Sequence, residues 1–269
     1  MVSKEQRQRH LARAKHERQQ RRRAEARTRA KQRNSLIAAV LAVVVVAGGG
    51  VWIASAVSGD DDKGGQDPTV NAADTAPPVN NAPKTCAAPE PGEPAAQSYP
   101  AEPAMAIDTN AAYEMVLRTT CGDITIALEA AKAPRTVNSF NFLAEQKYFD
   151  HTQCHRLTTE GIFVLQCGDP TATGNGGPGY QLPDENLGGA SYPAGTVAMA
   201  NSGPNTGGSQ FFLVEKDSPL PSDYTPFGRI TGGMDVLQKI AAAGTADMSS
   251  DGAPHENVVL NTVAVTKKT

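Results

Sequence analysis

The sequence predicts an all-β domain with two helices in residues 113–269. Short apolar runs alternate there with turns rich in Gly, Pro and Asn, which is typical of a barrel or a sandwich. Two segments instead repeat apolar residues at helical spacing: one begins at Pro134, and the other runs from Met234 to about Ala243. The expected strands are Met115–Arg118, Ile124–Leu128, Ile162–Gln166, Thr196–Ala200, Phe211–Glu215 and Val258–Thr266.

The basic charge of the chain is concentrated in its first 34 residues. The 269 residues carry 25 Lys and Arg against 28 Asp and Glu, a formal charge of −3. Residues 1–34 hold 13 of these bases and three acids, a net of +10, so the rest has 12 bases, 25 acids and a net of −13. We expect residues 1–34 to form a basic cytoplasmic tail beside anionic phospholipid, and we expect no nucleic-acid partner; nucleic-acid binding by the tail is the alternative.

Residues 35–57 predict a transmembrane signal-anchor. Leu36–Val57 contains no charged residue and as a helix would be about 33 Å long, enough for a hydrocarbon core of about 30 Å. Because the Lys and Arg lie before it, we expect a single-pass protein of the cell membrane with its N-terminus in the cytoplasm and its C-terminal domain extracytoplasmic. Cleavage at Ala54-Ser55-Ala56, which has the form of a signal-peptidase site, is the alternative.

Residues 58–112 predict a disordered tether. This Pro- and Ala-rich segment contains nine of the 19 prolines, nine acidic residues and one aromatic residue, Tyr99. Such a composition buries too little apolar area to offset the entropy lost on ordering. We therefore expect an extended acidic linker ahead of the domain at 113–269.

Two stretches of the domain carry candidate chemistry. Arg156 precedes an apolar strand that ends in Gln166-Cys167-Gly168-Asp169, so Gln166 can return across the sheet to meet it. A polar, Gly-rich loop then joins two apolar strands between Val197 and Val214. The run Gly174–Gly179 matches G-x-G-x-x-G, but it lacks the βαβ context of a dinucleotide site.

These motifs, in this order, resemble the cyclophilins, a family of peptidyl-prolyl cis–trans isomerases, over essentially all of 113–269. The resemblance implies a closed eight-stranded antiparallel barrel capped by two helices. The layout of tail, span, tether and domain is similar to that of membrane-anchored actinobacterial cyclophilins. The likeness is carried by Gly122-Asp123-Ile124, Ala133–Phe140, His155-Arg156, Gln166–Pro170, Gly174–Tyr180, Val197–Val214 and Thr225–Gly228.

Rotation about an X–Pro bond explains why such a site needs a fixed cation. The barrier is about 18–20 kcal/mol because amide conjugation must be broken. In the twisted state the prolyl nitrogen regains its lone pair and accepts a hydrogen bond, so a donor that favours this state lowers the barrier. The resemblance implies that Arg156 is the donor, that Gln166 holds it, and that the backbone of Asn201, with Ala200, binds the substrate chain.

The resemblance also implies a substrate groove and no cofactor or metal. Four residues, Thr158–Gly161, join the strand of Arg156 to the next, about two more than is usual in the family, so the register of Ile162–Val164 stays open. The implied substrate-binding residues are Phe163, Val164, Gly174, Ala200, Ser202, Gln210, Phe212, Leu220 and Tyr224.

Four cysteines in an exported protein favour disulfides. Cys154 and Cys167 end consecutive strands joined by a short loop, and Cys86 can then reach Cys121. Three pairings are possible, and we take Cys154–Cys167 with Cys86–Cys121 as a hypothesis.

The expected function is isomerisation of X–Pro bonds in proline-containing exported polypeptides, by a monomeric domain that the Leu36–Val57 segment attaches to the membrane. The alternative is a membrane-tethered adaptor or chaperone that binds proline peptides without requiring turnover. Arg156 and Gln166 favour the enzyme, because a binder has no need for a cation at the prolyl nitrogen.

Overall fold

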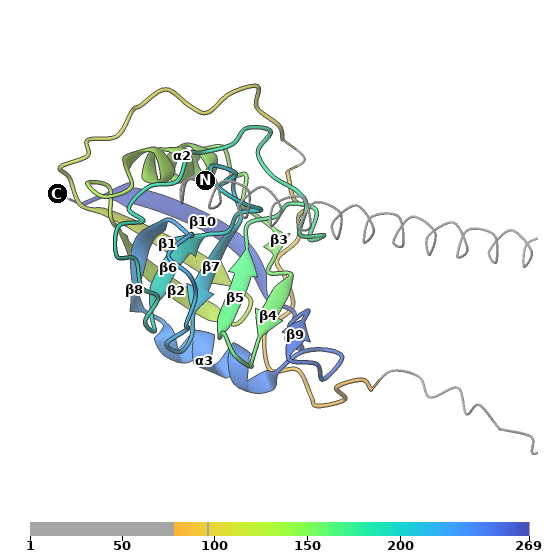
Figure 1. Cartoon of the computed structure of the whole chain (residues 1–269). Helices are drawn as coiled ribbons and strands as arrows, with labels where there is room; N and C mark the ends of the chain where they lie inside the picture. Colours follow the sequence, from red (N-terminus) through yellow and green to blue (C-terminus); the bar gives the residue numbers. More distant parts are fainter. Residues whose placement is uncertain (1–77, 96, 269) are drawn as a thin grey trace, which may run out of the picture. The chain divides into compact units, whose positions relative to one another are not determined.

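The computed structural model describes residues 78–95 and 97–268 (Figure 1). The expected basic tail at 1–34, the signal-anchor at 35–57 and residues 58–77 of the tether lie outside the described residues. Among those that are described, no helix has both the length and the apolar character needed to cross a bilayer.

The domain consists of β-strands and two helices, as the sequence predicts. The helices are α2 (Pro134–Glu145) and α3 (Met234–Ala243), which confirms both expected helices. The strands are β1 (Tyr113–Thr119), β2 (Gly122–Leu128), β3 (Thr152–Gln153), β4 (Arg156–Thr158), β5 (Val164–Cys167), β6 (Thr196–Met199), β7 (Phe211–Val214), β8 (Pro226–Gly232), β9 (Asp251–Gly252) and β10 (Val259–Lys267).

The strands form one curled antiparallel sheet, and the expected closed eight-stranded barrel is wrong. The strand order is β3-β10-β1-β2-β8-β6-β7-β5-β4-β9, a sheet of 10 strands with β3 and β9 at its edges. Each edge strand has only two residues, β3 pairing with β10 and β9 with β4, and the two edges do not pair with each other. The result is a half-barrel, with α2 at one end of the curl and α3 at the other (Figure 1).

Both helices cover the core through apolar stripes spaced at three and four residues. Val137, Phe140 and Leu143 of α2 are fully buried, and so are Leu237 and Ile240 of α3. The Phe140 ring lies against Phe149, Phe211 and Phe227, at centroid distances of 5.2, 5.5 and 4.6 Å. This main cluster holds the sheet and both helices together.

A second, smaller apolar cluster lies apart from the main core. Its buried members are Val164, Tyr192, Ala198, Phe212 and Val214, which come from β5, β6, β7 and the loop before β6. Partly buried side chains pack against this cluster: Ile162, Ala190, Ala200, Leu220 and Tyr224. Several of these side chains line the groove described below, so the second cluster is its apolar floor.

Residues 78–95 and 97–112, which we call the strap, correct the expectation of a disordered tether. The strap is joined to the domain by the disulfide Cys86–Cys121 and by hydrogen bonds to the buried carboxylate of Glu256. The domain thus supplies the disulfide and hydrogen-bond partners that order the strap. The structure also contains the second hypothesised disulfide, Cys154–Cys167.

Candidate active site

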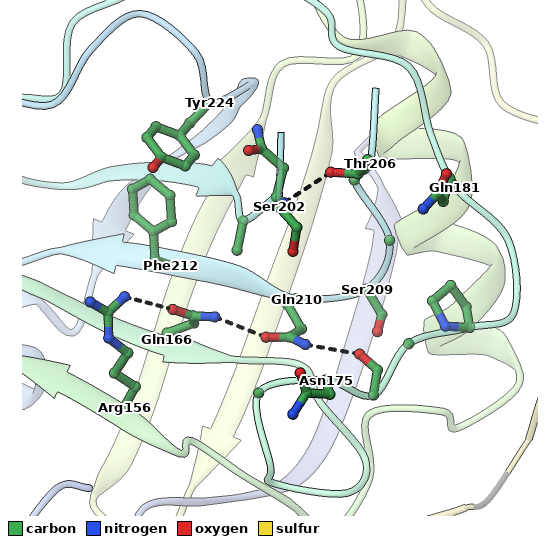
Figure 2. A pocket seen from close by; sticks show the side chains of 18 of the residues that line it. Arg156, Gln166, Asn175, Gln181, Ser202, Thr206, Ser209, Gln210, Phe212 and Tyr224 are labelled. Carbon is green, nitrogen blue, oxygen red and sulfur yellow. Dashed lines mark hydrogen bonds between the residues drawn. The ribbon is translucent and has the colours of Figure 1, made fainter. Parts of the chain in front are cut away.

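A groove of about 880 Å³ lies over β4, β5 and β7 (Figure 2). One wall is the loop 174–181, and the other is formed by residues 200–202 and the segment around 220–224. The groove brings together all but one of the predicted site residues: Arg156, Val164, Gln166, Gly174, Ala200, Asn201, Ser202, Gln210, Phe212, Leu220 and Tyr224.

A chain of side-chain hydrogen bonds runs along the groove from Arg156. Strand pairing sets Arg156 of β4 opposite Gln166 of β5. The Arg156 Nη1 donates to Gln166 Oε1 at 3.3 Å, and Gln166 Nε2 donates to Gln210 Oε1 at 2.8 Å. Gln210 Nε2 then donates to the carbonyl of Gly176 at 2.8 Å, as the dashed lines of Figure 2 show. Both glutamine side chains are thereby oriented.

Arg156 also forms an ion pair with Asp251, a residue that the sequence motifs do not point to. Nε and Nη2 of Arg156 lie 2.7 Å from Oδ1 and Oδ2 of Asp251, a two-point contact. The hydrogen bond from Arg156 lowers the pKa of Asp251, and the same bond raises the pKa of Arg156. The two residues are 95 positions apart. The signal that links them is the pairing of β4 with β9, which the sequence pattern did not reveal.

Apolar side chains line the groove beside the guanidinium. The Phe212 and Tyr224 rings meet edge to face, with centroids 5.4 Å apart (Figure 2). Val164 and Leu220 extend this surface. Together these four side chains form an apolar patch in the groove.

Phe163 is the predicted pocket residue that does not line the groove. The residue before it, Ile162, lines the groove instead, together with Val164. Side chains alternate between the two faces of an extended segment, so Phe163 points the other way, where Lys216 Nζ lies 5.2 Å from its ring centroid. The four-residue connection Thr158–Gly161 left this register open, and the pairing of Thr158 with Val164 fixes it.

Asn201 lines the groove, and its backbone groups have no partner within the described residues. Its side chain is used structurally: Nδ2 donates to the carbonyl of Asp223 at 2.7 Å, and Oδ1 accepts from Gly203 N–H at 3.2 Å. Among the residues that the structure describes, its backbone N–H and C=O make no hydrogen bond. Both groups are therefore available to an extended peptide, since an edge of backbone can pair as a strand does.

A buried carboxylate holds the opposite wall in place. Asp169 is fully buried, and its Oδ2 accepts from Gly174 N–H at 2.7 Å and from Gly176 N–H at 3.1 Å. Burial raises the pKa of Asp169, but these bonds and those from Thr171 outweigh it, so the pKa lies below its usual range. A Cβ on Gly176 would lie 1.9 Å from Asp169 Oδ1, which explains the glycine.

The half-barrel carries one groove of this size among the described residues, lined by apolar rings beside an ordered guanidinium. The model of the family "Cyclophilin type peptidyl-prolyl cis-trans isomerase/CLD" matches residues 114–265, more than half of the chain. The chain therefore belongs to the cyclophilin-type peptidyl-prolyl cis-trans isomerase family.

Relatives from bacteria, a fungus and a protozoan share the domain. "Probable peptidyl-prolyl cis-trans isomerase B" of Mycobacterium leprae is 47% identical over 161 residues, covering 55% of each chain. The protein of the same name in Mycobacterium tuberculosis is 48% identical over 159 residues, 54% of this chain and 52% of the relative. The chain thus spans about half the length of these two curated relatives.

Two further relatives match over most of their own length. "Peptidyl-prolyl cis-trans isomerase-like 1" of Gibberella zeae is 39% identical over 149 residues, 54% of this chain and 89% of the relative. A crystal structure of a cyclophilin-type isomerase from Cryptosporidium parvum has a TM-score of 0.51 and 26% identity, and covers 59% of this chain and 99% of that one.

Proposed function

We propose that the domain is a peptidyl-prolyl cis–trans isomerase in which Arg156 donates a hydrogen bond to the prolyl nitrogen of the twisted X–Pro bond. One observation carries this proposal: the Arg156–Gln166–Gln210 chain lies beside the apolar patch of Phe212 and Tyr224. A proline ring on the patch places its nitrogen at the margin where the guanidinium lies. The donor binds the twisted nitrogen better than the conjugated one, and this difference lowers the barrier.

The groove suits a polypeptide substrate. The free backbone groups of Asn201 can pair with the residues that flank the proline, while the apolar patch takes the ring. Because the two disulfides are compatible with an oxidising compartment, we propose that the clients are exported polypeptides.

We also propose that the protein is held at the membrane by Leu36–Val57, with the domain extracytoplasmic. The support is the uncharged span and the excess of Lys and Arg before it. Fractionation followed by an alkaline wash tests this placement, and the mass of the mature chain tests cleavage at Ala54-Ser55-Ala56. A wild-type chain released from membranes by the wash would contradict the anchor.

The isomerase proposal is tested with the full chain in detergent micelles. A protease-coupled assay on an Ala-Pro peptide measures the catalysed rate, and an Arg156→Ala variant is compared with it. Loss of one charge-assisted hydrogen bond in the transition state is expected to lower kcat/KM by about 10- to 100-fold. Peptide binding without acceleration by the wild type would favour the adaptor, and an unchanged rate in the variant would contradict the role of Arg156.

A further inference from the structure

Asp251 accepts two of the hydrogen bonds that the Arg156 guanidinium donates. We propose that Asp251 is a positioning residue, which fixes the orientation of Arg156 for catalysis; this inference rests on the proposed isomerase function. Asp251 binds Nε and Nη2 at 2.7 Å each, while Gln166 accepts from Nη1 at 3.3 Å. All three guanidinium nitrogens are therefore held, from two sides and by two different strands.

The same contacts leave donors for a substrate. A guanidinium has five N–H groups in one plane, and three of them are used by Asp251 and Gln166. Each terminal nitrogen keeps one N–H, so a donor remains for the prolyl nitrogen. The plane of these free donors is set by the two-point contact, since a bidentate pair fixes direction as well as distance.

Backbone contacts place Asp251 beside Arg156. In the pairing of β4 with β9, Thr158 lies opposite Asp251, and the Thr159 N–H donates to the carbonyl of Ser250 at 2.9 Å. Ser249 Oγ donates to the carbonyl of Asp251 at 3.0 Å. The carboxylate is thus carried by a short hairpin that is itself fixed to the strand of Arg156.

The strap supports this hairpin from outside. The Asn80 N–H donates to the carbonyl of Ala246 at 2.8 Å, and Asn80 Nδ2 donates to the carbonyls of Ala243 and Thr245 at 2.9 and 3.2 Å. These bonds tie the segment between α3 and β9 to the strap. Asp251 therefore sits on a restrained support rather than on a free loop.

Asp251 orients the Arg156 guanidinium but also offsets part of its positive charge. The solvent exposure of the two side chains decides which effect is larger. The carboxylate offsets part of the positive charge, which would weaken the donor, but the side chains of Arg156 and Asp251 are 40% and 53% exposed. Water screens charge at such a site, whereas it does nothing to order a long side chain with many rotamers. Orientation therefore dominates, and removal of Asp251 is expected to slow the reaction.

The test compares Asp251→Asn with the wild-type full chain in micelles, with kcat and KM separated by exchange NMR on a proline peptide. We expect kcat to fall about fivefold, the upper value for one exposed ion pair, with KM nearly unchanged. Asp251→Glu, which keeps the charge on a longer stem, is expected to recover part of the loss. Glu129→Gln is the matched control, because Glu129 also forms an exposed ion pair, with Lys132, and neither residue lines the groove.

A double-mutant cycle separates positioning from a general effect on the fold. In the Arg156→Ala background, Asp251→Asn is expected to change nothing further. If Asp251→Asn lowered kcat fivefold in the Arg156→Ala background as well, the proposal would be overturned. A kcat for Asp251→Asn alone that equals or exceeds that of the wild type would also overturn it.

A spectroscopic readout tests the proposal without turnover. The Arg156 Nε–H resonance should be protected from solvent exchange in the wild type and lose that protection in Asp251→Asn. If the wild type showed no isomerase activity, the proposed function would fall, while this resonance would still decide whether Asp251 holds the guanidinium. An unprotected Nε–H in the wild type would overturn the inference alone.

Discussion

Tyr99 of the strap donates its backbone N–H to the carbonyl of Pro178, at 2.7 Å, in the loop that forms one wall of the groove. Its ring packs edge-on against Phe142 of α2, with centroids 5.0 Å apart. The chain comes so close that a Cβ on Gly179 would lie 2.3 Å from Ser98 Oγ. The family model matches residues 114–265, so Tyr99 lies outside that match and yet supports one wall of the groove.

Replacing Tyr99 by Ala is expected to loosen the loop 174–181. Loss of the edge-to-face pair costs about 1 kcal/mol, and the backbone bond to Pro178 then opens more often. Hydrogen exchange of the loop amides should quicken, and KM for a proline peptide should rise while kcat changes little. Tyr99→Phe keeps the ring and is the control; loop exchange as slow in Tyr99→Ala as in the wild type would refute this bracing role.

Truncation of Ile162 and truncation of Phe163, the two residues before β5, should differ sharply in their effect on substrate binding. Ile162 lines the groove, whereas Phe163 faces Lys216 on the other side. Truncating Ile162 to Ala removes apolar contact worth about 1 kcal/mol, so kcat/KM should fall about fivefold. Phe163→Ala, measured in the same peptide assay, should lower kcat/KM less, although the Phe side chain is larger than that of Ile. A larger loss for Phe163→Ala than for Ile162→Ala would show that the substrate binds the face to which Phe163 points.

Much of the fold was predictable because local patterns determine it. The helices that begin at Pro134 and Met234 follow from apolar spacing, and the longer strands follow from runs of β-branched and aromatic residues. Closure of a barrel is not a local property. It depends on whether β3 and β9, two residues each, pair with one another, and no periodicity exists over so short a length.

The site was predictable where it lies on one pair of neighbouring strands. Arg156 and Gln166 belong to β4 and β5, so their meeting could be inferred from the order of motifs. Asp251 could not be found in this way, because it reaches Arg156 from 95 positions away through a two-residue strand. The strap was missed because its own composition says nothing about the partners that the domain supplies.

Removing the disulfide between Cys154, just before β4, and Cys167, at the end of β5, should lower stability. Cys154 and Cys167 are 13 positions apart, and replacing both by Ser should lower the free energy of unfolding by about 3 kcal/mol through a larger unfolded-state entropy. Cys86 and Cys121 close a longer loop of 35 positions, so the same account predicts about 4 kcal/mol for that pair. Urea denaturation of both double variants tests the order, and a larger loss for the shorter loop would contradict it.

Acid should weaken the attachment of the strap at Glu256. Burial raises the pKa of Glu256, but hydrogen bonds from Thr85 and Cys86 outweigh it and leave the pKa below its usual range. The stabilisation is therefore complete above the carboxyl's unfolded-state pKa, and it is lost as the pH falls through the lowered folded-state value.

Glu256→Gln makes this pH dependence measurable. The variant should be about 1–2 kcal/mol less stable than the wild type at pH 7, because bonds to a charged acceptor become bonds to a neutral one. The difference should shrink towards pH 3 in urea denaturation. Glu93→Gln, an exposed carboxyl in the same strap, is the control. A difference that stays constant with pH would contradict the assignment.

The Cys86–Cys121 bridge also determines how tension would travel through the molecule. Cys121 lies in the turn between β1 and β2, the third and fourth strands in the order of the sheet. A pull on the chain ahead of Asn80 would first load the hydrogen bonds of Asn80 and Thr85 and then pass through the sulfur atoms into that turn, so residues 87–120 would be bypassed. The contact of Tyr99 with Pro178 would then carry no load, so tension from that end of the chain should leave the groove wall undisturbed.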